Sequence, residues 1–405
     1  MLLCVSAAAA QQKAPAGREA ELRKAIAAGL VELASWCHEK KMRPEGRALV
    51  DEALGIDADS AKGKDLKGKL AGDSEADDAA RKEYPKRLET YGKRLAALYR
   101  ELFAQKHQPN QQQQWDKWLV RACELDAKAS LPLLDAETRE AHGKRDWARA
   151  HRLLTGAERV KSEPARAKTL KEVELKCAET TAVQKKASAH TMEYLLALPK
   201  GWTPARKWPI LVAVEGAGCN WQGMMNAYLG NRGDRPLILV VPITFSNTNA
   251  LDRAKYPYPQ EGLDEADRSG RMGFDEPGLL AVLDDVRREY AGAEKFFVTG
   301  FSGGGNLSFR MTFGHPEKLV ASAPACPNFS NPGKVSEAPE RENLPVKVFQ
   351  GDKDEYLNML ESQWQNAKSE FERSGFKGVS RVMLPGVGHS GCAKEVLDFF
   401  TPMLK

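Results

Sequence analysis

The sequence lacks three features that would each indicate a distinct class of protein. No segment approaches 18 consecutive apolar residues, so no membrane-spanning helix is expected. The seven cysteines form no Cys-x-x-Cys pair and no spacing typical of zinc ligands, so no metal site is expected. No basic patch carries interleaved aromatic residues, and acidic residues nearly balance basic ones, so no nucleic-acid surface is expected.

What the sequence does contain is enough apolar material for packed domains. Hydrophobic residues make up 42% of the 405 residues and aromatic residues 8%, which permits two or three folded domains. Three of the cysteines, Cys219, Cys326 and Cys392, each follow a predicted strand. These three are expected to gather at one end of a sheet, where an exported protein could join two of them in a disulfide.

The first residues read MLLCVSAAAAQQ, a short apolar run that ends in small residues. Ala8 and Ala10 form an A-x-A arrangement like that of a signal-peptide cleavage site, although the usual positive charge at the start is missing. Two interpretations of residues 1–17 stay open, a signal peptide and tail or only an apolar tail. The first predicts a secreted or periplasmic protein.

Residues 18–185 are predicted to form a helical domain. Apolar residues recur there at spacings of three and four, and no strand pattern interrupts them. The segment Leu54–Ala58 has a weak echo in Cys123–Ala127, at a separation close to two helix pairs of about 34 residues each. Degenerate tetratricopeptide-like repeats and a generic helical bundle fit this pattern equally well. The region shows no catalytic constellation, and binding of a protein partner is the role expected of it.

Residues 186–405 change character to alternating strands and helices. Such alternation predicts an α/β domain in which helices cover both faces of a mostly parallel sheet, with ligands bound at the carboxyl ends of the strands. The strands are predicted at Thr191–Leu198, Pro209–Val214, Pro236–Pro242, Lys295–Thr299, Leu319–Ala323, Val346–Gln350 and Ser380–Leu384.

One strand of this domain runs into the pattern G-x-S-x-G. The segment Lys295–Gly305 reads KFFVTGFSGGG, and a helix is predicted from Asn306 onward. Glycines on both sides of Ser302 permit a tight strand-to-helix turn that exposes the serine at its tip, as in a nucleophile elbow. The following amide, that of Gly303, lies at a helix N-terminus and is predicted to be one oxyanion donor.

A serine nucleophile requires a histidine base and an acid that orients it, which follow in the chain order Ser, acid, His. His389 lies in a glycine-rich loop after the last strand and is predicted to be the base. His315, at the end of the helix after Ser302, is interpreted as a structural cap. Asp352 and Asp354 both follow the strand Val346–Gln350, and either could be the acid.

The second oxyanion donor is expected from the loop after the strand Pro209–Val214. That loop begins with Glu215 and Gly216, and the amide of Ala217 is predicted to be the donor. The stretch Thr244–Phe274 shows little periodicity, so it is interpreted as a long loop that determines specificity. Four aromatic residues are predicted to bind substrate: Phe301, Trp221, Tyr256 and Tyr258.

Residues Thr191–Lys405 resemble the α/β-hydrolase superfamily, and within it the secreted esterases related to polyhydroxybutyrate depolymerases, feruloyl esterases and dienelactone-hydrolase-like predicted peptidases. The resemblance is carried, in order, by LPKGW, PILVAVEGAG, DDVRREY, FFVTGFSGGG, HPEKL, GDKD and GVGHS. It favours Asp354 as the acid, because such hydrolases carry G-x-x-D with an apolar residue three further on, here Leu357. Many relatives have histidine where this chain has Glu215.

The resemblance implies a serine hydrolase that uses Ser302, His389 and Asp354 to cleave carboxylic esters, including polymer-linked ones, through an acyl-enzyme and without a cofactor. Two alternatives stay open. One is a serine peptidase of the same fold. The other is a helical-repeat adaptor fused to an inactive hydrolase domain, which the departure at Glu215 favours.

Overall fold

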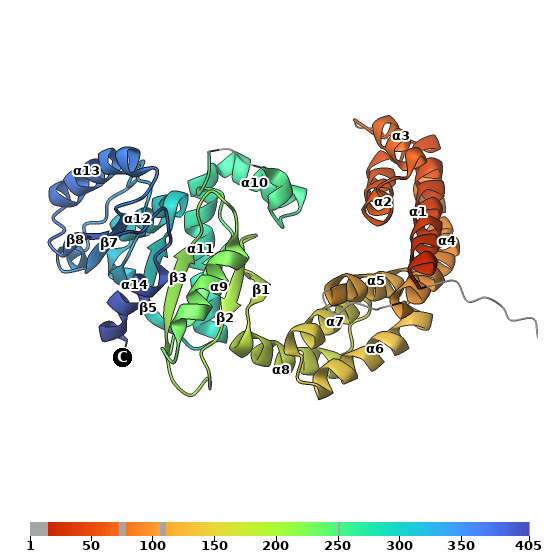
Figure 1. The fold of residues 1–405 in the computed structure, drawn as a ribbon, viewed down its shortest axis with the longest axis horizontal. Helices are drawn as coiled ribbons and strands as arrows, with labels where there is room; N and C mark the ends of the chain where they lie inside the picture. The colour runs from red at the N-terminus through yellow and green to blue at the C-terminus, as the bar shows by residue number, and fades with distance from the viewer. Residues whose placement is uncertain (1–14, 73–77, 106–110, 250–251, 405) are drawn as a thin grey trace, which may run out of the picture. The chain divides into compact units, whose positions relative to one another are not determined.

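The computed structural model describes residues 15–72, 78–105, 111–249 and 252–404 (Figure 1). The chain divides into two compact units, Met1–Val173 and Glu174–Lys405. This division falls before the 185/186 boundary taken from the sequence. The segment 1–17 interpreted as a signal peptide lies outside the described residues, apart from its last three. Among the helices that the structure describes, none is long and apolar enough to cross a membrane.

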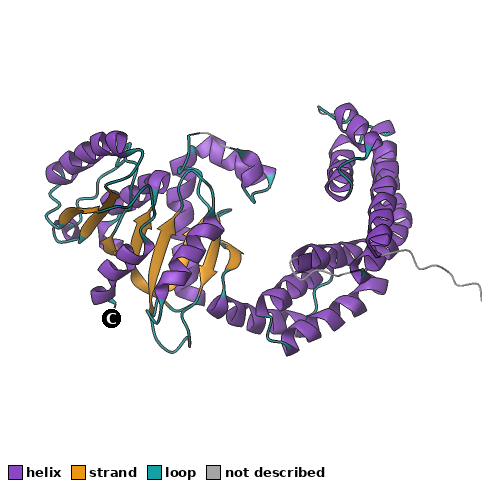
Figure 2. Ribbon diagram, viewed as in Figure 1, coloured by secondary structure: helices purple, strands orange, loops and turns teal. Residues whose placement is uncertain are grey.

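The first unit is built from helices, and successive helices pack in pairs (Figure 2). Its core includes Leu30, Leu95 and Leu119, all with no exposed surface. Side chains of Ser60, Asp126 and Asp146 cap helix N-termini by accepting backbone N–H groups. The helices are α1 (Pro15–Glu39), α2 (Arg43–Ile56), α3 (Ala61–Lys69), α4 (Asp78–Ala104), α5 (Gln112–Leu125), α6 (Ala127–Gly143) and α7 (Trp147–Val160), followed by α8 (Pro164–Thr180), which crosses the division between the units.

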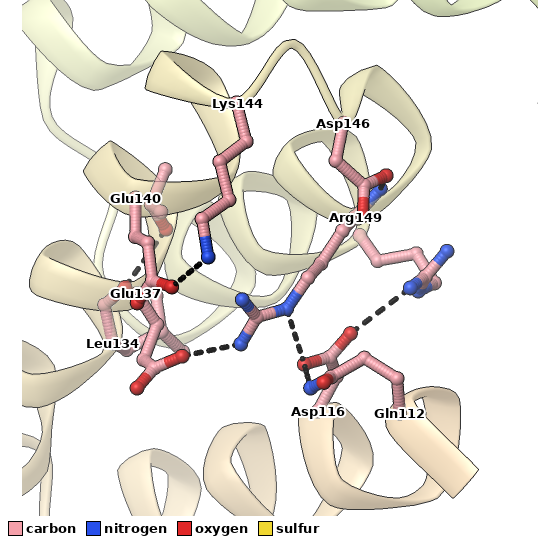
Figure 3. Close-up of polar contacts among 10 residues, drawn as sticks. Gln112, Asp116, Leu134, Glu137, Glu140, Lys144, Asp146 and Arg149 are labelled. Carbon is pink, nitrogen blue, oxygen red and sulfur yellow. Dashed lines mark hydrogen bonds and ion pairs between the residues drawn. The ribbon is translucent and has the colours of Figure 1, made fainter. Parts of the chain in front are cut away.

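A buried group of charges joins α5, α6 and α7 in this unit (Figure 3). Arg149 donates from Nε to Asp116 Oδ1 at 3.1 Å and forms an ion pair with Glu137. Arg152 donates to the other oxygen of Asp116 at 3.0 Å. Asp116 is 2% exposed and Arg149 7%, so each charge depends on its partners for solvation.

The second unit contains an eight-stranded sheet in the order β1-β2-β4-β3-β5-β6-β7-β8. β2 is antiparallel to β1 and β4, and the remaining pairs are parallel. This order, with helices covering the sheet, is that of the α/β-hydrolase fold, so the predicted fold class is confirmed (Figure 1). The strands are β1 (Val183–Lys186), β2 (Glu193–Ala197), β3 (Trp208–Val214), β4 (Ile238–Pro242), β5 (Gly292–Gly300), β6 (Leu319–Ser322), β7 (Val346–Gly351) and β8 (Val379–Leu384).

The central strands form the core of this unit, since β3, β4 and β5 consist largely of buried aliphatic and aromatic residues. Around them α9 packs against α14, and α11 packs against α12. The α-helices are α9 (Trp221–Arg232), α10 (Gln260–Ser269), α11 (Arg271–Glu289), α12 (Gly305–Gly314), α13 (Leu357–Arg373) and α14 (Ala393–Phe400).

Several elements differ from the sequence prediction, and β1 and α10 show why. β1 was not predicted, because in Val183–Lys186 only Val183 is buried and the other residues are polar. The stretch Thr244–Phe274 is not a bare loop, because it contains α10. That helix buries Leu263 and Ala266 on one face, too few apolar residues for its periodicity to be recognised.

Candidate active site

Ser302 lies two residues after the end of β5, at the start of the turn into α12. Its φ of 50° places a non-glycine residue in the left-handed region, a strained conformation typical of a nucleophile elbow. The turn has no room for side chains on the glycines around it. A Cβ atom at Gly303 would lie 1.8 Å from the carbonyl oxygen of Asn247, and one at Gly304 would lie 2.4 Å from that of Val214. The partly exposed serine is therefore held by a backbone that only glycine allows.

Asp354 and His389 meet at the carboxyl ends of β7 and β8. Asp354 Oδ2 lies 2.8 Å from His389 Nδ1. The same oxygen accepts a hydrogen bond from Gln350 Nε2 at 2.8 Å, and Oδ1 accepts the backbone N–H of Tyr356 at 2.8 Å. Burial favours a raised pKa for Asp354, but these hydrogen bonds, led by that of His389, outweigh it and lower the pKa. The ionised carboxylate can hold the proton on Nδ1, which leaves Nε2 to act as a base.

Asp352, the other candidate acid, has a different role. Its Oδ1 accepts the backbone N–H of Gly386 at 2.7 Å, so it fastens the turn after β8 to the turn after β7. His315 lies 2.9 Å from Glu276 through its Nε2, a contact between helices α12 and α11. Both side chains therefore hold the framework around the site together, while the acid and base contact is that of Asp354 with His389.

The imidazole of His389 lies between two aromatic rings. Phe301 is centred 4.8 Å from it and Tyr356 4.9 Å, the latter edge-on. Phe301 immediately precedes Ser302, so this contact joins the serine turn to the histidine loop. Burial lowers the pKa of His389, yet hydrogen bonds with Cys326 and Asp354 outweigh it, and the pKa is raised.

The predicted oxyanion loop passes beside Ser302. A Cβ atom at Gly216 would lie 3.0 Å from Ser302 Cβ, so the backbone of the loop and the nucleophile are neighbours. Asn247, which is buried, donates from Nδ2 to the carbonyl oxygen of Gly216 at 2.8 Å. This bond fixes the loop that carries Ala217, whose side chain is exposed.

Glu215 is the first residue of this loop and is 7% exposed. Burial raises the pKa of its carboxyl to about 7, although hydrogen bonds from the backbone at Asn220 and Gly216 act against the rise. The carboxyl of Glu215 thus stabilises the conformation of the loop by accepting hydrogen bonds from the loop's own backbone N–H groups. Near neutral pH it changes between a neutral and a charged form beside the predicted oxyanion donors.

The four aromatic residues predicted to bind substrate differ in their surroundings, and three of them, Trp221, Tyr256 and Tyr258, are linked by ring contacts. Phe301 packs on His389, as described above. Trp221 is buried against Tyr256, with ring centroids 5.1 Å apart, and its indole N–H has no hydrogen-bond partner within the described part of the chain. Tyr258 is instead a core residue. It donates to the carbonyl oxygen of Ile243 at 2.6 Å and accepts the N–H of Glu193 at 3.0 Å, because its ring belongs to the aromatic core between β4 and α11.

Four further residues shape the site and were not predicted to do so: Asn247, Cys326, Gln350 and Tyr356. Cys326 is buried after β6, and its side chain hydrogen-bonds those of His389 and Cys392. Both cysteines are free thiols. Position after a strand was the available signal for Cys326, and position at the end of a strand, four residues before Asp354, was the signal for Gln350. Asn247 lies in an irregular segment that gives no such signal.

Comparisons with known proteins add no family assignment. No protein-family model matches the chain, and no curated protein matches its sequence. Solved structures that resemble it include poly(aspartic acid) hydrolase-1 from Sphingomonas sp. KT-1, at 16% identity and a TM-score of 0.39, covering 55% of this chain and 98% of that one. A poly(3-hydroxybutyrate) depolymerase from Bordetella parapertussis has 18% identity and a TM-score of 0.40, covering 55% and 91%. An S-formylglutathione hydrolase from Staphylococcus aureus has 12% identity and a TM-score of 0.40, covering 55% and 95%. The assignment of the fold rests on the strand order itself.

Proposed function

We propose that the chain is a serine hydrolase that cleaves carboxylic esters. Ser302 Oγ attacks the ester carbonyl while His389 accepts its proton and Asp354 stabilises the imidazolium that forms. The backbone N–H groups of Gly303 and Ala217 stabilise the oxyanion. His389 then protonates the departing alcohol, and water, deprotonated by the same imidazole, releases the acyl group from Ser302.

The observation that carries this proposal is the Asp354–His389 hydrogen bond of 2.8 Å, formed at the same sheet edge as the strained Ser302 turn. A structural aspartate would need only its turn contacts. Asp354 instead directs one oxygen to both His389 and Gln350 and is nearly buried. Both oxygens of this carboxylate accept hydrogen bonds, which suits it to orienting a base rather than to contacting solvent.

An exposed aromatic ring against His389 supports a bulky or polymer-linked ester. Tyr356, whose ring contacts His389, is 49% exposed, and Met359, three residues later in α13, is also 49% exposed. Large apolar groups are usually buried, so these exposed groups favour contact with an apolar part of a substrate.

A fluorophosphonate probe tests the proposal directly, because it reacts with an activated serine. The full chain is treated with the probe, and the modified peptide is identified by mass spectrometry. We expect labelling at Ser302, abolished in Ser302→Ala and retained in Ser330→Ala, which removes an exposed serine hydroxyl bonded to Asn306. Hydrolysis of p-nitrophenyl acetate should follow the same pattern.

Two results would contradict the ester hydrolase. Equal turnover by wild type and Ser302→Ala, with no labelling at Ser302, would favour the alternative function, a helical-repeat adaptor with an inactive hydrolase domain. Labelling at Ser302 combined with cleavage of peptide substrates and no cleavage across a panel of acetyl, butyryl and feruloyl esters would indicate the peptidase instead.

A further inference from the structure

Four side chains with metal-binding atoms, including that of the proposed catalytic histidine, meet at the carboxyl ends of β6, β7 and β8. The Sγ atom of Cys326, a carboxylate oxygen of Asp354 and a ring nitrogen of His389 all lie within 4.8 Å of one another. The thiol of Cys392 joins them by a hydrogen bond with Cys326. Cys326, Asp354 and Cys392 are 0%, 6% and 5% exposed, and the His389 side chain is 13% exposed.

This donor set matches the preference of zinc. Zn²⁺ takes four ligands in a tetrahedron from cysteine sulfur, histidine nitrogen and carboxylate oxygen, at about 2.0–2.3 Å, which places neighbouring ligand atoms roughly 3.4–3.8 Å apart. In the protein the ligand atoms of Cys326, Asp354 and His389 lie within 4.8 Å of one another, so small side-chain rotations would bring them to that spacing. Mg²⁺ and Ca²⁺ prefer oxygen ligands, so a site with two thiols does not suit them. We propose that Cys326, Cys392, His389 and Asp354 bind Zn²⁺ and that the bound ion inhibits the hydrolase.

The surroundings of these side chains suit ligands in a metal site. Gln350 Nε2 lies 2.8 Å from Asp354 Oδ2 and 3.7 Å from Cys326 Sγ, so one amide orients two of the ligands. The partly exposed face of His389 provides an entry path for the ion. The ligands follow three different strands, β6, β7 and β8, which explains why no metal-ligand spacing is visible in the sequence.

Inhibition follows from the chemistry of the imidazole, and this step rests on the proposed function. If the ion binds Nδ1, the ring proton moves to Nε2, and Nε2 can no longer accept the proton of Ser302. If the ion binds Nε2, it occupies the lone pair directly.

Co²⁺ serves as a spectroscopic probe for the site, because thiolate ligation gives it an intense charge-transfer absorption. The full chain is reduced, freed of reductant under anaerobic conditions and titrated with Co²⁺, and the bound Co²⁺ is then displaced by Zn²⁺. We expect the absorption in wild type and in Ser302→Ala, because Ser302 is not a ligand. Cys326→Ser and Cys392→Ser should each lower the affinity for Co²⁺ by at least about tenfold. Cys123→Ser, which removes a buried free thiol from the helical unit, should bind like wild type.

Activity is measured separately with p-nitrophenyl acetate. Zn²⁺ should inhibit wild type, and Cys392→Ser should require at least about tenfold more Zn²⁺ for the same inhibition. Absence of the absorption in the reduced wild type would overturn the site, as would an unchanged absorption in Cys326→Ser and Cys392→Ser. The peptides that contain Cys326 and Cys392 could also retain a mass two hydrogens below that of the two free thiols after the chain is reduced. That result would overturn the site and indicate a Cys326–Cys392 disulfide. Co²⁺ binding needs no catalysis, so it distinguishes a failed metal site from a failed hydrolase.

Discussion

The carbonyl oxygen of Asn247 lies 1.8 Å from the point where Gly303 would carry a Cβ atom. Any side chain at position 303 must therefore displace either the serine turn or the segment after β4. We expect Gly303→Ala to lower kcat/KM for p-nitrophenyl acetate by at least about 100-fold, because a displacement near 1 Å at a catalytic group has that effect. Gly314→Ala is the matched control, since its Cβ would lie 3.5 Å from the nearest atom. Wild-type turnover by Gly303→Ala would show that the turn is not so confined.

Substitution of Asp354 and of Asp352, which have different hydrogen-bond partners, tests which aspartate is the acid of the site. Asp354→Asn keeps the shape of the side chain but presents an amide to His389, which favours the wrong tautomer. We expect kcat to fall by about four orders of magnitude. Asp352→Asn keeps the oxygen that accepts the N–H of Gly386, so its kcat should stay close to that of wild type. The reverse order of effects would make Asp352 the acid.

The buried charges of the helical unit give a prediction about stability. Arg149→Met removes the buried ion pair with Glu137 and one of the two ion pairs of Asp116, which keeps its ion pair with Arg152 and its hydrogen bond from Gln112. We expect the free energy of unfolding of this unit to fall by about 3–5 kcal/mol, the cost of removing one partner of a buried ion pair. Urea unfolding of the full chain, followed by far-ultraviolet circular dichroism, would measure it. Arg159→Met is the control, because Arg159 is 67% exposed in its ion pair with Glu124, and such pairs contribute at most about 1 kcal/mol.

The sequence predicts the sheet well where burial is strong and poorly where it is weak. Strands β3, β4 and β5 are short apolar runs that a parallel sheet requires, and they were all identified. β1 contains two lysines and one buried residue, so only its pairing with β2 makes it a strand. Helix α10 was not identified for a related reason, since tertiary packing selects its two buried residues.

The site divides in a similar way. Ser302, Asp354 and His389 are recognisable because each follows a strand with glycines nearby, in a fixed chain order. Asn247 is not recognisable, because its importance comes from a backbone position opposite Gly303 that the chain reaches only after folding. Tyr258 was predicted to bind substrate because its position in the folded core is likewise not visible in the sequence. Nothing local in its sequence shows that its hydroxyl contacts β2 and the end of β4.

Glu215 should make stability depend on pH. Burial raises the pKa of its carboxyl from 4.5 to about 7, so as the pH rises the unfolded chain ionises first. Folding therefore loses stability between about pH 4.5 and pH 7, and the loss is constant above that range. Glu215→Gln removes it. We expect the variant and wild type to be similar at pH 4.5 and the variant to be more stable at pH 8 by roughly 2 kcal/mol, after allowance for solvent screening.

The measurement is the urea midpoint of both chains at the two pH values. Asp275, whose burial raises its pKa to about 6, is present in both chains, so its contribution cancels in the difference. Glutamine keeps a carbonyl oxygen that can accept the N–H of Gly216 or Asn220. An equal difference between the two chains at pH 4.5 and pH 8 would mean that Glu215 does not titrate in this range.

Trp221 distinguishes a substrate contact from a structural one. Its indole N–H lies in a buried position and has no acceptor among the described residues, which costs stability in the free protein. If a bound ester supplies the acceptor, Trp221→Phe should lower kcat/KM about 5- to 10-fold, the effect of one hydrogen bond, and should leave thermal stability unchanged or higher. Trp202→Phe is the matched control, because its indole already donates to the carbonyl oxygen of Tyr290 at 2.8 Å. That variant should lose stability and keep its kcat/KM. If Trp221→Phe loses stability without a change in kcat/KM, Trp221 is a core residue. Tyr258 is a core residue by the same distinction, because its hydroxyl contacts lie within the core.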